Sequence, residues 1–204
     1  MKKKIYLLRH GETTYNRKGI YQGILDSPLT EVGKQQAQTN GFLLKRKLIA
    51  VADQEIMFVS SPLERALQSS ALIQKILNRN SLTLITDERL KEVNIGRWNG
   101  KNKEQIQQVH PTIDCDAFNW YFNSPDGESL FEVKERCNDF IRDLTEIEAE
   151  HVIIMAHGLF GRVFRGCLLN LSNEELLRLD VPQTGFFMIE KQHVLFITNQ
   201  FDDF

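Results

Sequence analysis

Short apolar runs alternate with helix-like patterns along the chain, and this alternation limits the possible fold more than any other feature of the sequence. Each run is only four or five residues long, which suits a buried strand. Helical periodicity fills longer intervals between the runs, as in residues 30–48 and 158–169. Such alternation predicts an α/β fold, in which a layered, mostly parallel sheet carries helices on both faces. The expected strands are residues 5–8, 56–59, 82–85, 152–156, 186–189 and 194–197.

The whole chain, residues 1–204, is expected to form one domain. It contains no internal repeat, no low-complexity tract and no linker rich in glycine and serine. A chain of this length buries roughly 70% of the surface that its unfolded form exposes, so it can build a substantial core. One stretch breaks the alternation, because residues from about 99 to 128 are rich in aromatic side chains and lack a clear period. We expect residues 99–128 to form an irregular, lid-like insertion over one edge of the domain.

Two helix starts carry capping signals. Residues 61–64 read Ser-Pro-Leu-Glu, which predicts a capping box with proline at the first helical position. Ser129 and Glu132 predict a second capping box. The apolar side of the helix that follows Ser129 is formed by Val133, Cys137, Phe140, Ile141 and Leu144. The sequence therefore predicts one helix beginning at Pro62 and another just after Ser129.

Charge and cysteine content exclude several classes of protein. The formal net charge is −2 and there is no basic stripe, so no nucleic-acid partner is expected. Three scattered cysteines provide neither a disulfide framework nor zinc-ligand pairs, as is typical of a reducing cytoplasm. The apolar run that ends at Leu8 is shorter than the about 7–15 residues of a secretory signal, and no segment approaches the roughly 20 apolar residues of a membrane span. We expect a cytoplasmic protein with no membrane partner.

Three of the predicted strands end in residues suited to binding an anion. Arg9 and His10 follow the first run. Arg65 lies about one turn beyond the second run, and His157 follows the fourth. In open α/β sheets, ligands bind beyond the carboxyl ends of the strands, where loops from separate strands meet. Because guanidinium groups and helix N-termini both favour phosphate oxygens, the sequence predicts a phosphate site at this edge of the sheet.

The segments around these residues resemble the motifs of the histidine phosphatase superfamily, the phosphoglycerate-mutase-like proteins. Residues 8–13, Leu-Arg-His-Gly-Glu-Thr, resemble the family signature, and residues 60–69 resemble its second arginine motif. The further matches are Tyr15-Asn16, residues 22–30, residues 90–92 with 96–100, and residues 156–158. The matches follow the order of the family and span most of the chain, so the resemblance is specific. It implies a phosphoglycerate-mutase-like fold.

The resemblance also implies a role for each of the principal residues. His10 would attack phosphorus in line and form a phosphohistidine, which water then hydrolyses. Arg9, Arg65 and His157 would hold the non-bridging phosphate oxygens. Glu92 would protonate the leaving oxygen and then activate the water. This chemistry requires no metal and no other cofactor.

Other residues of the site are less firmly defined by the sequence. Those implied by the resemblance to bind phosphate or substrate are Asn16, Gln22, Gly23, Gly158 and Thr184. The segment around Thr184 departs from the commoner family pattern, which leaves its phosphate contact open. Glu88 lies four residues before Glu92 and is the alternative acid. Glu128 resembles a recurring family position, and whether it does more than order a loop and cap a helix is also open.

A metal centre is the main alternative chemistry, and the spacing of the histidines argues against it. His151 and His157 lie at opposite ends of one predicted strand, about 20 Å apart at a rise of about 3.3 Å per residue, so they cannot share an ion. No Cys/His pair stands at zinc spacing, and no cluster of carboxylates accompanies His10. We therefore expect no metal site.

The charge of the insertion favours a phosphatase over a mutase. Residues 104–133 contain no lysine or arginine, but they hold six acidic and five aromatic residues. If this stretch covers the pocket, like-charge repulsion selects against bisphosphates and favours a monophosphate on a partly apolar leaving group. We therefore expect a phosphomonoester hydrolase that acts on a small phosphorylated metabolite, with room for broad specificity.

Two other functions remain open at this point. One is a phosphoglycerate mutase, and the other is a non-catalytic protein that binds a phosphorylated ligand. The sequence does not identify the leaving group, which could belong to a sugar phosphate, to α-ribazole phosphate, or to a phosphorylated amino acid or protein. The oligomeric state is also open.

Overall fold

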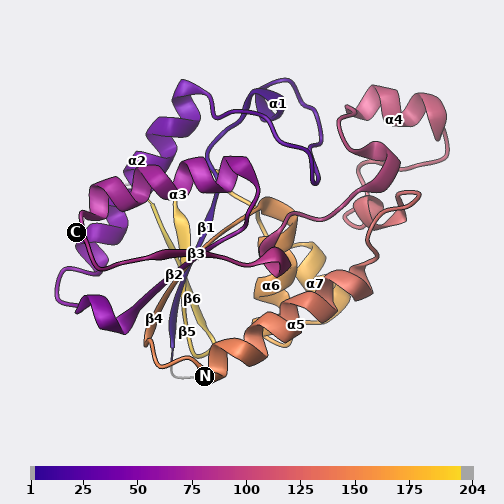
Figure 1. Ribbon diagram of the computed structural model, residues 1–204. Helices are drawn as coiled ribbons and strands as arrows, with labels where there is room; N and C mark the ends of the chain where they lie inside the picture. The colour runs from indigo at the N-terminus through magenta and orange to yellow at the C-terminus, as the bar shows by residue number, and fades with distance from the viewer. Residues whose placement is uncertain (1–2, 199–204) are drawn as a thin grey trace, which may run out of the picture.

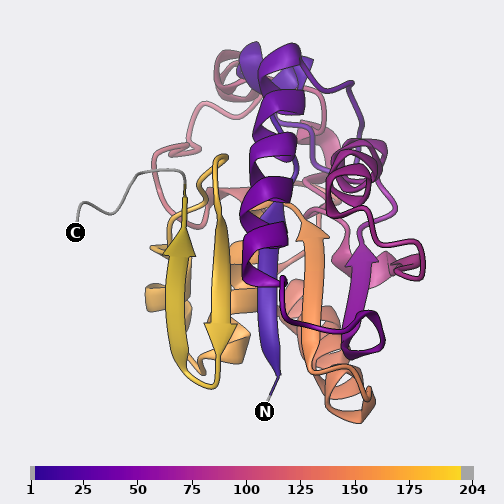
Figure 2. The same cartoon turned by 90° about the vertical axis from the view of Figure 1, so that its left-hand side faces the viewer.

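The computed structural model describes residues 3–198 of the chain, and within that range six strands form one sheet. The strands are β1 (Lys4–Arg9), β2 (Ile56–Ser60), β3 (Leu84–Thr86), β4 (His151–Ala156), β5 (Phe186–Glu190) and β6 (His193–Ile197). Their order across the sheet is β3-β2-β4-β1-β5-β6. The first four strands run parallel to one another, whereas β5 runs antiparallel to β1 and β6 antiparallel to β5 (Figure 2). The predicted α/β fold with a mostly parallel sheet is confirmed.

Helices cover both faces of this sheet. The α-helices are α1 (Thr14–Arg17), α2 (Glu31–Lys47), α3 (Glu64–Leu77), α4 (Lys103–Val109), α5 (Leu130–Glu146), α6 (Gly158–Leu168) and α7 (Asn173–Leu177). Short 3₁₀ helices are η1 (Asp53–Glu55), η2 (Glu88–Leu90), η3 (Gly96–Trp98) and η4 (Trp120–Asn123). Helices α2 and α3 pack on one face, and α5 and α6 pack on the other (Figure 1).

Alternate side chains of each central strand enter two separate cores. Ile5 and Leu7 of β1 pack in the core that contains α5 and α6, whereas Tyr6 and Leu8 pack in the core that contains α2 and α3. This division follows from the two-residue period of a strand, which turns successive side chains to opposite faces. The central strands β1, β2 and β4 are mostly apolar because both of their faces are buried, whereas the edge strands β3 and β6 are partly exposed.

The carboxyl ends of β1, β2 and β4 lie at one edge of the sheet. Strands β1 and β4 pair in parallel up to Arg9 and Ala156. Backbone bonds continue beyond the strand ends, since the N–H of His10 donates to Ala156 O at 3.2 Å and the N–H of Ser61 donates to Met155 O at 2.8 Å. The first residue after β1 and the first after β2 are therefore both fixed beside the end of β4.

Most of the predicted elements form, but β3 begins two residues later and ends one residue later than expected. The expected strand at residues 82–85 forms instead at Leu84–Thr86, where it pairs with Phe58–Ser60 of β2. Leu82 is buried next to that strand and packs into the core with α2 and α3. The helix predicted at residues 30–48 is α2, which Thr30 caps, and the capping box of Ser129 opens α5 as predicted.

The capping box predicted at residues 61–64 is wrong. Helix α3 begins at Glu64, and its N-cap residue Leu63 has no capping side chain. The carboxylate of Asp26, from a distant loop, caps the helix instead by accepting from the N–H of Glu64 at 2.8 Å and of Arg65 at 3.3 Å. Ser61 is free for another partner, because a cap supplied from elsewhere already satisfies the helix N-terminus.

The insertion at residues 99–128 is more regular than its sequence suggested. It contains the helix α4, which Asn102 opens with a capping box to Gln105, and the turn η4. Trp120 of η4 is buried, with its ring 5.3 Å from Trp98 and 4.8 Å from Tyr21 between centroids. These aromatic contacts attach the insertion to the loop that follows α1.

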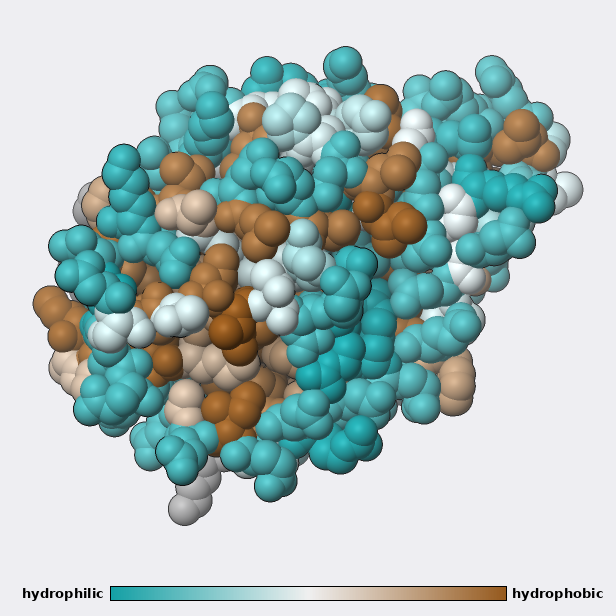
Figure 3. Space-filling model, viewed as in Figure 1, coloured by the Kyte–Doolittle hydropathy of each residue, from teal (hydrophilic) through white to brown (hydrophobic). Residues whose placement is uncertain are grey.

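The outer surface over α5 is mostly hydrophilic (Figure 3). This agrees with the helix pattern, since the predicted apolar positions lie inward; of these, Ile141 alone stays partly exposed. Among the helices described between residues 3 and 198, none has both the length and the apolar content that crossing a bilayer would require.

A close approach between two backbones sets the loop after β1 against the start of α2. A Cβ atom on Gly33 would lie 2.0 Å from the carbonyl oxygen of Glu12, and one on Gly11 would lie 2.1 Å from the carbonyl oxygen of Gly33. Such distances leave no room for a methyl group, so the helix reaches this position only with glycine at both sites.

We expect Gly33→Ala to destabilise the protein by about 2 kcal/mol, although alanine usually favours a helix over glycine by about 1 kcal/mol. Gly161→Ala in α6 is the matched control, because its Cβ would meet nothing closer than Leu7 at 3.7 Å. That control should be neutral or slightly stabilising. Chemical denaturation of both variants measures the difference, and a Gly33→Ala protein as stable as the Gly161→Ala protein would contradict the close approach.

Candidate active site

An open pocket lies beyond the carboxyl ends of β1, β2 and β4. It holds about 850 Å³ of empty space, including the solvent at its mouth. Most of the residues singled out from the sequence line it, namely Arg9, His10, Asn16, Gln22, Gly23, Arg65, Glu92 and Gly158. The site residues thus come together from strand ends and loops that are far apart in the chain.

Hydrogen bonds fix the protonation pattern of the His10 ring. Its Nδ1 lies 2.8 Å from the carbonyl oxygen of Gly11, which can only accept, so Nδ1 carries the proton. Its Nε2 accepts from Nε of Arg65 at 3.3 Å, since a guanidinium N–H can only donate. His10 is 2% exposed. The lone pair of the ring is therefore on Nε2, on the side of the arginine.

The surroundings of His10 favour its neutral form. Burial, together with the guanidinium groups of Arg65 and Arg9, holds its pKa well below the ordinary value of 6.5, and the bond to Gly11 opposes this only in part. A neutral imidazole keeps a lone pair available for attack on an electrophile. The electrostatics of the pocket therefore suit a nucleophile at neutral pH.

Arg65 is held by the loop that follows α1. Its Nη1 donates to Leu25 O at 2.7 Å and to the carboxylate of Asp26 at 2.8 Å, and its Nη2 donates to Gly23 O at 2.7 Å. Only 1% of the side chain is exposed. Asp26 thus has two functions, because the same carboxylate that caps α3 also pairs with the first arginine of that helix. Gly23 reaches its carbonyl position with a φ of +50°, which favours glycine.

Arg9 lies across the first residue of α6. Its Nη1 donates to Val181 O at 2.5 Å, and its buried Nε has no hydrogen-bond partner among residues 3–198. A Cβ on Gly158 would lie 3.2 Å from Cζ of Arg9, so glycine allows the guanidinium to lie close against the helix start. Burial lowers the pKa of Arg9, and the nearby carboxylate of Glu92 opposes that shift. A buried guanidinium donor without a partner in the described residues therefore lies beside the first residue of α6.

His157 lies beside His10, with ring centroids 5.2 Å apart. Its Nε2 is 2.7 Å from Oγ of Ser61, and its Nδ1 is buried without a partner in the described part of the chain. Ser61 Oγ also accepts from the N–H of Leu63 at 3.3 Å. Where the serine hydroxyl donates to Nε2, the imidazole proton lies on Nδ1 and is a further unpaired donor. Burial and the charge of Arg65 hold the pKa of His157 well below 6.5.

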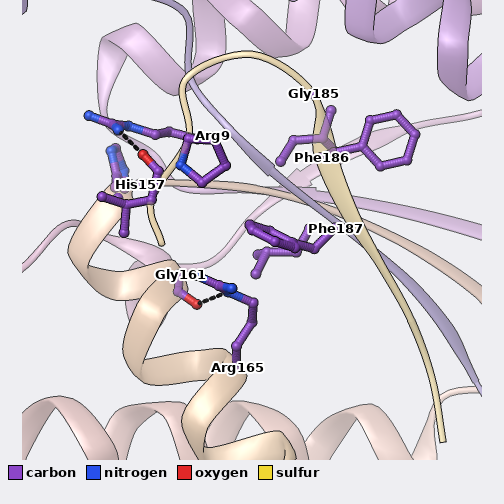
Figure 4. A pocket seen from close by; sticks show the side chains of 12 residues that line it. Arg9, His157, Gly161, Arg165, Gly185, Phe186 and Phe187 are labelled. Carbon is purple, nitrogen blue, oxygen red and sulfur yellow. Dashed lines mark hydrogen bonds between the residues drawn. The ribbon is translucent and has the colours of Figure 1, made fainter. Parts of the chain in front are cut away.

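A second, apolar pocket lies next to Arg9 and His157. Figure 4 shows Arg9 and His157 on one side of it, with Arg165 and Phe187 on the other. The guanidinium of Arg165 lies 3.8 Å from the centroid of the Phe187 ring, and burial lowers its pKa to about 10.

Glu92 enters the pocket from the loop between η2 and η3. One carboxylate oxygen accepts from the N–H of Val93 at 3.0 Å and of Phe160 at 2.9 Å, and the other accepts from Leu159 at 3.2 Å. The carboxylate is thus attached to the first turn of α6. Glu88, the alternative acid, belongs to η2, pairs with Lys91 at 2.5 Å and does not line the pocket.

Of the residues expected to bind phosphate or substrate, Asn16 and Gln22 lie at the pocket and Thr184 does not. Oδ1 of Asn16 accepts from the backbone N–H of Thr13 at 3.1 Å, and Oε1 of Gln22 accepts from Ser27 at 3.0 Å. The structure does not bring Thr184 to the pocket, because its side chain is exposed. Its neighbour Gln183 points inward instead, with its amide 3.3 Å from the carbonyl oxygen of His10. The turn before β5 thus presents the residue before the predicted one.

Several residues of the site were not found from the sequence. Tyr121 of the insertion lines the pocket, and Asp26, Ser61 and Gln183 fix its principal groups. Only Ser61 directly follows a strand, and the function of Asp26, Ser61 and Gln183 is revealed only by their distant partners. Asp26 and Ser61 did fall within motif segments, so a motif was the one available signal. In residues 3–198, no three His, Cys, Asp or Glu side chains are grouped so that they could hold a metal ion.

Comparison with known proteins agrees with this arrangement. The sequence model of the histidine phosphatase superfamily (branch 1) matches residues 5–199, and the chain belongs to this superfamily. A protein of Hydrogenobacter thermophilus provisionally named phosphoserine phosphatase 2 is 34% identical over 93% of this chain and 90% of its own. A 2,3-bisphosphoglycerate-dependent phosphoglycerate mutase of Bifidobacterium longum is 30% identical over 88% of this chain and 82% of its own.

A solved structure shows the same fold. The mycobacterial glucosyl-3-phosphoglycerate phosphatase superposes with a TM-score of 0.80 and 24% sequence identity, over 96% of this chain and 98% of that one. The histidine phosphatase family expected from the motifs, and the phosphoglycerate-mutase-like fold, are both confirmed.

We expect Asp26→Asn to lower kcat/KM about 10-fold, because a hydrogen bond to a charged group contributes about 1.5–3 kcal/mol and here it orients Arg65. Asp53→Asn is the matched control, since Asp53 pairs with Arg79 at 2.5 Å, just beyond the other end of α3. Steady-state kinetics on a phosphomonoester compares the two variants. Equal activities for both would show that Arg65 keeps its position without the carboxylate.

Acidic pH should destabilise the folded state through the two buried histidines. In the unfolded chain each histidine binds a proton as the pH falls below about 6.5, whereas in the folded protein both stay neutral to lower pH. Stability is therefore lost as the pH falls below that value. In phosphate-free buffer, the wild type should lose about 1.4 kcal/mol more than His157→Gln between pH 7.5 and 5.5. Parallel pH profiles of the free energy of unfolding would contradict a neutral, buried His157.

Proposed function

We propose that the protein hydrolyses phosphomonoesters of small metabolites through a phosphohistidine formed at His10, without a metal or other cofactor. The observation that carries this proposal is the state of His10, whose Nε2 lone pair lies against a buried arginine while Nδ1 is held by a backbone carbonyl. The ring is neutral and oriented, and the nearest charges are cationic. This combination suits attack on a phosphate dianion.

The first step transfers the phosphoryl group to His10. The hydrogen bond that Nε2 accepts from Nε of Arg65 breaks first. A bond then forms between Nε2 and phosphorus as the bond from phosphorus to the leaving oxygen breaks, and the freed N–H of Arg65 donates to a phosphate oxygen. Arg9, Arg65 and His157 stabilise the charge on the non-bridging oxygens, with the unpaired Nε of Arg9 and Nδ1 of His157 as ready donors. Glu92, in its acid form, gives a proton to the leaving oxygen, so the product departs as a neutral alcohol.

The second step returns the enzyme to its starting state. Glu92, now a carboxylate, takes a proton from water, and the water oxygen attacks phosphorus as the bond to Nε2 breaks. Inorganic phosphate leaves, and the ring regains its lone pair. Two displacements of lower barrier replace one difficult displacement. The bonds that Glu92 accepts from Leu159 and Phe160 keep it in place through both steps.

The walls of the pocket favour a monophosphate on a partly apolar leaving group. Beyond the phosphate-binding end, the lining side chains are mainly apolar or phenolic, namely Ile20, Tyr21, Ile95, Tyr121, Leu159 and Val181. Tyr121 comes from the insertion at residues 99–128, which we propose acts as a lid on a single domain formed by the whole chain. The lack of lysine and arginine in residues 104–133 disfavours a second phosphate on the substrate.

The named relatives support a small metabolite as substrate. Phosphoserine and glucosyl-3-phosphoglycerate are the substrates named for two of them, and both are monophosphates. The relative from Bifidobacterium longum is a mutase, which keeps phosphoglycerate mutase as the second candidate. A cytoplasmic location is part of the proposal, supported by three cysteines that are all free thiols.

A substrate panel tests the proposal directly. The wild type should release phosphate from several small monophosphates at the same rate with and without a chelator, and His10→Ala should lose this activity. His193→Ala, on the exposed strand β6, is the control and should keep it. With 3-phosphoglycerate, we expect phosphate release to exceed formation of 2-phosphoglycerate. Fast interconversion with little phosphate would establish the mutase instead, and inhibition by chelator would contradict a metal-free reaction.

A further inference from the structure

The loop that carries Glu92 is held by an ion pair outside the pocket. Arg136 of α5 lies against Glu128, which precedes that helix, in a two-pronged contact: Nε donates to one carboxylate oxygen at 2.8 Å and Nη2 donates to the other at 3.1 Å. The side chains are 15% and 25% exposed, respectively. Solvent screens such a pair less than it screens a surface ion pair, and its geometry is well defined.

Both members of the pair also bind the backbone on either side of Glu92. Nη1 of Arg136 donates to the carbonyl oxygen of Lys91, the residue before Glu92, at 2.7 Å, and to that of Arg89. The carboxylate of Glu128 accepts from the N–H of Asn94 at 2.8 Å, and its own N–H donates to Asn94 O at 2.8 Å. The peptide group before Glu92 and the backbone of Asn94, two residues after it, are therefore both fixed by Arg136 and Glu128.

A further contact joins the ion pair to the carboxylate itself. The guanidinium of Arg136 lies 5.0 Å from the centroid of the Phe160 ring, and the N–H of Phe160 donates to Glu92. Arg136 therefore lies against both groups that determine where the carboxylate points, which are its own loop and the first turn of α6. Neither Arg136 nor Glu128 lines the pocket, so an effect on the reaction must pass through the residues that this loop presents to it. Of these, Glu92, Val93 and Ile95, only Glu92 can transfer a proton.

We infer that Glu128 and Arg136 are positioning residues, which hold Glu92 where it can protonate the leaving oxygen. This inference rests on the proposed role of Glu92 as the acid. It also gives Glu128 a function beyond ordering a loop. An error of about 1 Å in the position of a catalytic group can cost about 100-fold in rate, so a loosened loop should affect proton transfer before it affects phosphate binding.

The dependence on leaving group separates this function from a general loss of structure. An alkyl alcohol leaves poorly without a proton, whereas a nitrophenol leaves as a stable anion and needs no acid. A displaced Glu92 should therefore lower kcat/KM for an alkyl phosphate and spare an aryl phosphate. Partial unfolding lowers both values equally, so the ratio of the two within one preparation reports only on the acid.

The experiment measures kcat/KM for 2-glycerol phosphate and for 2,4-dinitrophenyl phosphate in the wild type, Glu92→Gln and Glu128→Gln. We expect Glu92→Gln to lower the first value about 10²-fold or more and to change the second less than about 3-fold. Glu128→Gln keeps the size of the side chain but not its charge. It should lower kcat/KM for 2-glycerol phosphate about 10-fold and spare kcat/KM for 2,4-dinitrophenyl phosphate. Arg136→Lys, which cannot form the two-pronged contact, should behave like Glu128→Gln.

Two controls make the outcome decisive. Arg142→Gln removes an exposed ion pair with Asp139 on the same helix and should leave both values unchanged. In the Glu92→Gln background, adding Glu128→Gln should cause no further selective loss, because the group that it positions is already absent. If Glu92→Gln is selective and Glu128→Gln is not, the positioning function is wrong while the role of Glu92 stands. If Glu92→Gln itself is not selective, the role of Glu92 falls and the inference falls with it.

Discussion

The buried guanidinium of Arg65 is the group on which the rest of the site depends. A charge with 1% exposure is costly unless its donors are satisfied, and here two carbonyl groups, a carboxylate and the ring of His10 accept from it. Those acceptors come from the loop after α1 and from the end of β1, whereas Arg65 itself belongs to α3. Satisfying one cation therefore joins three separate segments of the chain at the edge of the sheet.

The same cation determines the chemical state of its neighbours. Arg65 disfavours the protonated form of both His10 and His157, and burial acts in the same direction. The pocket thus collects positive charge in its arginines and keeps its imidazoles neutral, an arrangement that a phosphate dianion completes. Nε of Arg9 and Nδ1 of His157 are buried without partners in the described residues, which fits this interpretation because a bound anion would satisfy a donor at either position. The carboxylate of Glu92 is held by backbone N–H groups of the first turn of α6, which suits its proposed role as the acid for the leaving oxygen.

Much of this arrangement was predictable from the sequence because it depends on regular periodicity. Six apolar runs gave the sheet, and the residues following three of them gave His10, Arg65 and His157 as neighbours, since the carboxyl ends of parallel strands share an edge. The predicted start of α3 was wrong, because the local pattern from Ser61 to Glu64 cannot reveal that Asp26, from a distant loop, caps the helix. Thr184 was predicted to reach the pocket, but its neighbour Gln183 points inward instead. The turn before β5 has no regular periodicity, so the sequence could not show which of the two adjacent residues points inward. The network of Glu128 and Arg136 was out of reach, since its bonds go to backbone groups that carry no sequence signal.

The central claim is that Nε2 of His10 accepts the phosphoryl group because Nδ1 is committed to the carbonyl of Gly11. The most direct measurement is ¹⁵N NMR of protein labelled at histidine, in which the adduct is trapped with Glu92→Gln and an aryl phosphate and kept at alkaline pH. The account predicts a single phosphohistidine, on His10, with phosphorus bound to Nε2. Phosphorus on Nδ1, an adduct on His157, or turnover without any adduct would contradict it.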